Sequence, residues 1–160
     1  MELYSFILEH REIIKIIYAL AIILICGIIV LKSHKMFKLS EYQGIRYFRN
    51  AFFFYGVAFF IRYLLGSYTL PFSPEYFSLI EILFSFFFIM AGFFLLYSLL
   101  WKRIESIEAF SSIFNLRILI FYLMSIILVA LDYLWGGLQF LFYSQVFIFL
   151  LAFAISFNNY

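Results

Sequence analysis

Five long apolar runs, separated by short polar segments, dominate the pattern of hydrophobic and polar positions along the chain. They cover residues 13–31, 47–65, 79–101, 116–133 and 138–157. A helix needs about 20 mostly apolar residues to cross the hydrocarbon core of a bilayer, whereas a transmembrane β-strand needs about half that number. Because only helices and closed barrels satisfy backbone polar groups in lipid, the runs predict transmembrane helices. We therefore expect an all-α fold, a polytopic bundle of about five spans that forms a single integral membrane domain over residues 1–160.

The composition agrees with a membrane location. Of the 160 residues, 67% are hydrophobic and only 12% are charged, whereas soluble domains average about 25% charged residues. Too little polar surface exists to coat a water-soluble globule of this size. The sequence therefore predicts a multi-pass protein of the cell membrane, whose first partner is the lipid bilayer.

The polar segments between the runs are short. About fifteen residues separate the first two runs, and residues 102–112 form a predicted charged loop. Ser73-Pro74-Glu75 is typical of a helix start, with Ser as the N-cap and Pro at the first helical position. Trp135-Gly136-Gly137 predicts a tight turn between the last two helices.

The distribution of cations over these segments predicts an orientation. Arg11, Lys15 and Arg62 lie on the side of the N-terminus in a five-span arrangement. The opposite side carries the larger group of cations, which is Lys32, Lys35, Lys38, Arg46, Arg49, Lys102, Arg103 and Arg117. Since cytoplasmic loops carry an excess of Lys and Arg, we expect the N-terminus outside and the C-terminus inside.

A charged cluster at the outer helix ends is the best candidate for a ligand or ion site. Arg62, Glu81 and Asp132 fall at similar depth on the second, third and fourth helices, and Arg62 is the natural partner for both acids. Three interpretations stay open: an ion pair that fixes helix packing, the mouth of a polar ligand site, or a proton-carrying Glu81. Gln145, in the fifth helix, is expected to hydrogen-bond across helices and belongs to the same hypothesis.

Small and polar residues recur on single faces of three of the predicted helices. Such stripes allow close helix contact in lipid, so the charged residues on them are expected to face other helices. The stripes are Ala51, Tyr55, Ala58 and Arg62; Ser78, Glu81, Ser85 and Gly92; and Ser125 with Asp132.

A second polar group lies on the predicted cytoplasmic side. Arg46, Arg49 and Asn50 precede the body of the second helix, and Asn115 and Arg117 begin the fourth. Basic residues near the membrane surface attract anionic lipid headgroups, and each Lys or Arg contributes about 1 kcal/mol of binding free energy. We expect contact with lipid there, with a partner protein or an anionic ligand as the alternative.

Other chemistry is not indicated by the sequence. Cys26 is the only cysteine and is expected to be a small buried side chain, while His10 and His34 both lie outside the predicted spans. No catalytic residues, metal site, cofactor or nucleic-acid contact is therefore predicted. No glycine-rich phosphate loop is present either.

The functional prediction is accordingly broad. The layout resembles the membrane input modules of microbial sensors and small transporter-type subunits, in architecture only. We expect a non-enzymatic accessory or sensor-like subunit that packs against other membrane proteins or against itself as a homo-oligomer. The alternative is a small transporter, channel subunit or substrate-binding component that uses the polar site at the outer helix ends.

Overall fold

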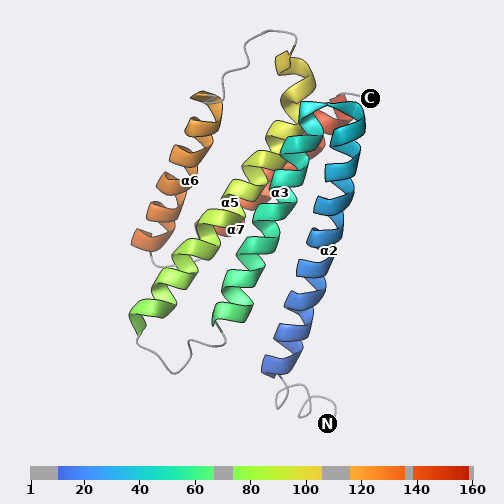
Figure 1. Cartoon of the computed structure of the whole chain (residues 1–160). Helices are drawn as coiled ribbons and strands as arrows, with labels where there is room; N and C mark the ends of the chain where they lie inside the picture. Colours follow the sequence, from blue (N-terminus) through green and yellow to red (C-terminus); the bar gives the residue numbers. More distant parts are fainter. Residues whose placement is uncertain (1–10, 67–73, 106–115, 136–138, 159–160) are drawn as a thin grey trace.

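The described part of the chain is entirely helical in the computed structural model (Figure 1). It comprises residues 11–66, 74–105, 116–135 and 139–158, with side chains described for residues 13–66, 78–101, 118–135 and 141–157. This confirms the predicted all-α class. The elements are α2 (Arg11–Ser40), α3 (Gln43–Phe59), the π-helical segment η1 (Phe60–Leu65), α5 (Pro74–Glu105), α6 (Leu116–Trp135) and α7 (Gln139–Asn158).

The first helix is longer than its apolar run, and the predicted connection of about fifteen residues is wrong. Helix α2 continues to Ser40 and the chain turns at Glu41 and Tyr42. Glu41 has a φ of 54°, and its N–H donates to the Phe37 carbonyl at 2.8 Å, which closes the helix with a left-handed residue. The physical reason is that Lys, Met and Leu are good helix formers, so a polar composition ends the apolar run without ending the helix.

The other helices start or end close to the predicted positions. Helix α5 begins at Pro74, as the Ser-Pro-Glu pattern predicts, although Ser73 itself lies outside the described residues. Helix α3 begins at Gln43, four residues before its apolar run, and α5 continues to Glu105, into the segment predicted as a loop. The predicted turn at residues 136–137 also lies outside the described residues.

Helix α5 lies at the centre of the bundle. It packs most extensively against α3 and also contacts α6 and α7, while α2 packs against α3 (Figure 1). With 32 residues, α5 is about 48 Å long at 1.5 Å per residue.

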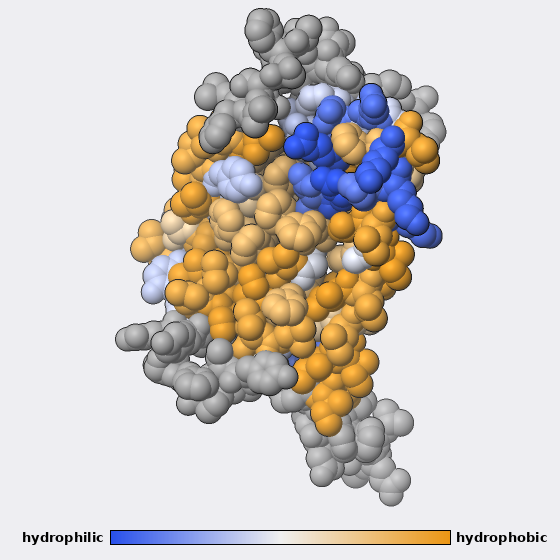
Figure 2. Space-filling model, in the orientation of Figure 1, coloured by the Kyte–Doolittle hydropathy of each residue, from blue (hydrophilic) through white to orange (hydrophobic). Residues whose placement is uncertain are grey.

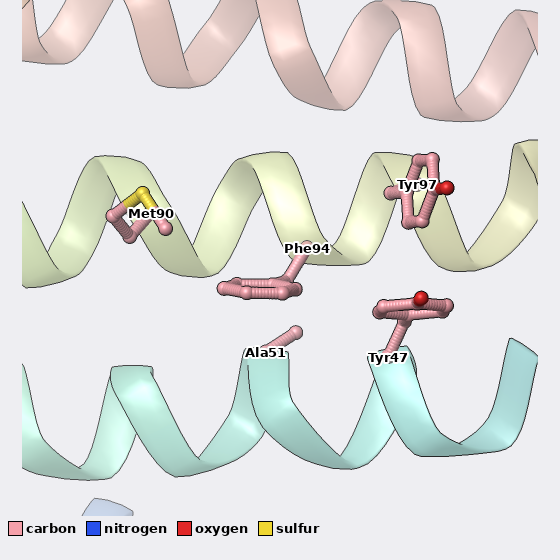
Figure 3. Close-up of a cluster of buried hydrophobic side chains, with 5 residues drawn as sticks. All are labelled: Tyr47, Ala51, Met90, Phe94 and Tyr97. Atoms are coloured by element: carbon pink, nitrogen blue, oxygen red, sulfur yellow. The ribbon is translucent and has the colours of Figure 1, made fainter. Parts of the chain in front are cut away.

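Aromatic rings fill much of the contact between α3 and α5. Tyr47 and Tyr97 meet edge to face, with centroids 4.6 Å apart at an angle of 81° (Figure 3). Phe54 stacks on Phe94 with centroids 5.2 Å apart, and Ala51, which is fully buried, faces Phe94 from the opposite helix. Offset and edge-to-face ring pairs of this kind add to the packing energy of a core. Part of the high aromatic content is thus used in helix packing.

Three helices among the described residues are long and apolar enough to cross a membrane. They are Ile13–Ser40, Ser78–Trp101 and Ile118–Trp135, and Leu141–Phe157 is a shorter apolar helix. In the most apolar 18-residue stretch of each helix, 44% of α5 is buried inside the structure, but only 11% of α2 and 17% of α6. Apolar side chains therefore cover the outside of the bundle, as the broad orange surface of Figure 2 shows.

Candidate functional site

The three charged residues of the predicted outer cluster belong to elements that meet at one end of the bundle. The end of η1 and the start of α5 lie at the lower end of Figure 1, on the side of the N-terminus, and the end of α6 points in the same direction. Among the described residues, no ion pair or hydrogen bond links the three side chains to one another.

Arg62 lies on an aromatic ring. Its guanidinium carbon is 4.4 Å from the centroid of the buried Phe84 ring, which is a cation–π contact. Within the described residues, no ion pair joins Arg62 to Glu81 or Asp132, so the ion pair, one of the three interpretations left open by the sequence, is not formed there. Arg62 belongs to η1, and π-helical turns of this kind are rare and often mark functional sites.

The two acids have separate environments. Asp132 is buried, and its Oδ1 accepts a hydrogen bond of 3.4 Å from the backbone N–H of Leu141, in the first turn of α7. The first N–H groups of a helix have no partner within it, so this carboxylate ties α6 to the start of α7. Glu81 is half-buried on α5 and is engaged in no ion pair or hydrogen bond in the described part of the chain.

Gln145 forms the polar centre of the bundle and confirms the expected bond across helices. From α7, its Nε2 donates to the Phe88 carbonyl of α5 at 2.9 Å. Its Oε1 is 3.5 Å from the Tyr55 hydroxyl of α3, so one buried amide reaches two other helices. Gly92 gives it room, because a Cβ there would lie 3.1 Å from Oε1 and 3.3 Å from Nε2.

The small-residue stripes lie at helix contacts, as the sequence predicts. Ala51, Ala58 and Ser125 are fully buried, and Ser85 is nearly so. Cys26 is also buried, and a Cβ on Gly56 would lie 3.4 Å from its Cβ, which shows how closely α2 approaches α3. Small side chains at these crossings let the helix backbones come together.

The basic end of the bundle carries the second predicted group. Figure 2 shows hydrophilic residues gathered over the end of α2 and the start of α3. Arg49 Nη1 lies 2.9 Å from His34 Nδ1, and its Nη2 donates to Asn50 Oδ1 at 3.4 Å. Arg46 is exposed; Asn115 and the side chain of Arg117 lie outside the described residues, so they cannot be placed in this group.

An apolar groove runs between α2 and α3 below this basic end. Its volume is about 250 Å³, and it is open on one side. Gly27 and Gly56 form part of its floor, since neither carries a side chain that would fill it. The remaining lining residues are Ile23, Cys26, Val30, Phe52, Phe53, Val57 and Phe60.

Several of these residues were not singled out by the sequence analysis. The sequence predicts His34 outside the first helix because it follows the apolar run, but α2 includes His34. A detectable signal exists: His34 is spaced from Ile23, Gly27 and Val30 by helical intervals, so these four residues share one face of the longer helix. Phe84 gives no such signal, because one Phe among 25 does not identify itself as the neighbour of an arginine.

Over the side chains that the structure describes, no three His, Cys, Asp or Glu residues gather closely enough to hold a metal ion.

The comparisons with known proteins give little guidance. No protein-family model and no solved structure matches the chain. A stretch of 49 residues, 31% of this chain, is 39% identical to part of an uncharacterized protein of Archaeoglobus fulgidus. The matched stretch spans only 22% of that protein.

Proposed function

We propose that the chain is a multi-pass protein of the cell membrane, with five crossings and its N-terminus outside. The long apolar helices α2, α5 and α6 support this placement. Helix α3 continues directly into η1, from Gln43 to Leu65, and α7 has 20 residues. At 1.5 Å per residue, 20 residues extend about 30 Å, which equals the thickness of the hydrocarbon core.

The charges at the two ends support the orientation. The exposed cations Lys32, Lys35, Lys38 and Arg46 lie at the end of the bundle where α2 meets α3. Among the described side chains, the other end has Lys15 and Arg62. The positive-inside tendency then assigns the α2–α3 turn to the cytoplasm.

Within this membrane placement, we propose a non-enzymatic accessory or sensor-like subunit that acts through helix packing with partners or with a second copy. The observation that carries this proposal is the hydrogen bonding of two buried polar side chains. Gln145 and Asp132 both bond to the backbone of a neighbouring helix, which is a packing role. The large uncovered faces of α2 and α6 supply surface for further helices.

Extraction of the tagged protein from its native membrane tests this proposal. The chain should stay with the membrane in alkaline carbonate and should enter lipid-polymer discs together with a second polypeptide or a second copy in fixed ratio. A disc that holds one 19.2 kDa chain alone, at every expression level, would refute the packing role. Release by carbonate would refute the membrane placement itself.

A transport role is the second candidate, and the half-buried Glu81 supports it because no neighbouring cation in the described residues neutralises its carboxylate. The test is proton flux into proteoliposomes under an imposed potential. Glu81→Gln should abolish the flux without changing the thermal stability, while Glu41→Gln, at the opposite end, should leave it unchanged. Equal flux with and without the Glu81 carboxylate would exclude this role.

A further inference from the structure

The groove between α2 and α3 and the cationic end above it form one continuous feature. Arg49, Phe53, Gly56 and Phe60 recur at intervals of four, three and four residues, so they share one face of α3 and the turn that follows it. Ile23, Gly27, Val30 and His34 have the same spacing on the antiparallel α2. The contact of Arg49 with His34 therefore lies about one helical turn beyond Phe53 and Val30, at the basic end of the groove.

We propose that this groove binds one anionic phospholipid, with the phosphate at Arg49 and His34 and an acyl chain along the floor formed by Gly27 and Gly56. The inference rests on the proposed membrane placement and identifies the lipid that the basic end recognises. It excludes a purely diffuse attraction between the basic end and the membrane surface.

The chemistry of the contact between Arg49 and His34 suits a phosphate. A guanidinium only donates hydrogen bonds, so His34 Nδ1 is the acceptor and its Nε2 carries the proton. Arg49 keeps further N–H groups, and His34 has an N–H, that can donate to phosphate oxygens. Lys38 and Arg46, each one turn closer to the α2–α3 turn, are exposed on the same side, while Glu41 adds one negative charge in the turn.

The dimensions suit an acyl chain of one leaflet. From Arg49 to Phe60 the helix advances eleven residues, which is about 16 Å. Half of a hydrocarbon core of about 30 Å is about 15 Å. A lipid anchored at the basic end would therefore have its chain beside Gly27 and Gly56 and would end near the middle of the bilayer.

Gly27 offers a variant that blocks the groove without disturbing the protein. Among the described residues, a Cβ at Gly27 meets nothing within 4 Å, and Gly27 lines the groove, so Gly27→Phe fills the groove rather than the core. Gly66→Phe is the matched control, because a Cβ at Gly66 also meets no described residue within 4 Å and this glycine lies at the opposite end. Circular dichroism melting of both variants in detergent verifies that they fold.

The measurement is retention of phosphatidylglycerol, compared with phosphatidylcholine, by native mass spectrometry of the full chain released from detergent micelles. The wild type and Gly66→Phe should each retain one phosphatidylglycerol in preference to phosphatidylcholine, and Gly27→Phe should lose it. Arg49→Gln should weaken retention about fivefold, the equivalent of about 1 kcal/mol for one cation near anionic lipid. Lys32→Gln, which removes an exposed cation from a different face of α2, should have a smaller effect.

Three results would overturn the inference. They are equal retention of both lipids, undiminished retention by Gly27→Phe, and a dimer of the wild type that Gly27→Phe dissociates, since a second copy would then fill the groove. Each can occur while the chain still resists carbonate extraction, so a failure here is distinct from a failure of the proposed membrane placement.

Discussion

Gly92 on α5 lies directly against the amide of Gln145 on α7, and its missing side chain is the space that this amide occupies. A leucine at this position would meet the Gln145 amide and the tip of Ile148, both in a buried contact. Overpacking of this kind costs about 1–3 kcal/mol. We expect Gly92→Leu to lower the melting temperature in detergent, and Gly66→Leu, where a Cβ meets no described residue within 4 Å, to leave it nearly unchanged. Equal melting temperatures for the two variants would show that Gly92 is not a close contact.

The two hydrogen bonds of Gln145 should differ in strength. The bond to the Phe88 carbonyl is 2.9 Å long, whereas the Tyr55 hydroxyl is 3.5 Å away, at the limit of a hydrogen bond. Bonds between membrane helices average about 0.6 kcal/mol and reach about 1.7. We therefore expect Gln145→Leu to cost about 1 kcal/mol in free energy of unfolding and Tyr55→Phe to cost less. A Tyr55→Phe effect larger than that of Gln145→Leu would contradict this order.

Arg62 should be energetically coupled to Phe84 and not to Glu81. The contact of the guanidinium with the ring corresponds to about 0.5–1 kcal/mol at a partly exposed site. A double-mutant cycle with Arg62→Gln and Phe84→Leu measures that coupling, and a second cycle with Glu81→Gln serves as the control. Coupling in the Glu81 cycle alone would restore the ion pair that the sequence predicts.

Asp132 should act as a hydrogen-bond acceptor for α7 rather than as a charge. Asp132→Asn keeps an oxygen that can accept from the Leu141 N–H, so a small change in stability is expected. Asp132→Leu leaves a buried donor without this acceptor, which costs about 1–3 kcal/mol. The free energy of unfolding in mixed micelles distinguishes the two. If both substitutions cost the same, the charge and not the hydrogen bond is what matters.

The sequence predicts the helices well because each apolar run is long and continuous. It also predicts the bond of Gln145 to another helix, since an amide in the middle of an apolar helix needs a hydrogen-bond partner outside that helix. It fails at the end of α2, because the change from apolar to basic residues after Leu31 ends the apolar run but not the helix, which continues to Ser40. Hydropathy and backbone conformation are separate properties at such a boundary.

The partners of the charged residues could not be predicted in the same way. Arg62, Glu81 and Asp132 do fall near the same end of the bundle, as their positions in the runs require. The neighbours of each side chain depend on the rotation of its helix about the helix axis and, for Arg62, on the π-helical turn. The spacing of apolar residues predicts neither of these features. The sequence does not predict the groove either, because the groove depends on how α2 and α3 are aligned. Their antiparallel alignment places Gly27 beside Gly56.

The membrane topology is tested most directly by labelling single cysteines in intact cells with a maleimide that cannot cross membranes. Cys26 is the only native cysteine, so Cys26→Ala gives a background without thiols. In that background Trp135→Cys, at the exposed end of α6, should react from outside, and Lys38→Cys, at the end of α2, should react only after the membrane is permeabilised. Labelling of Lys38→Cys from outside would reverse the orientation, and labelling of both positions in intact cells would contradict a bundle that crosses the membrane between them.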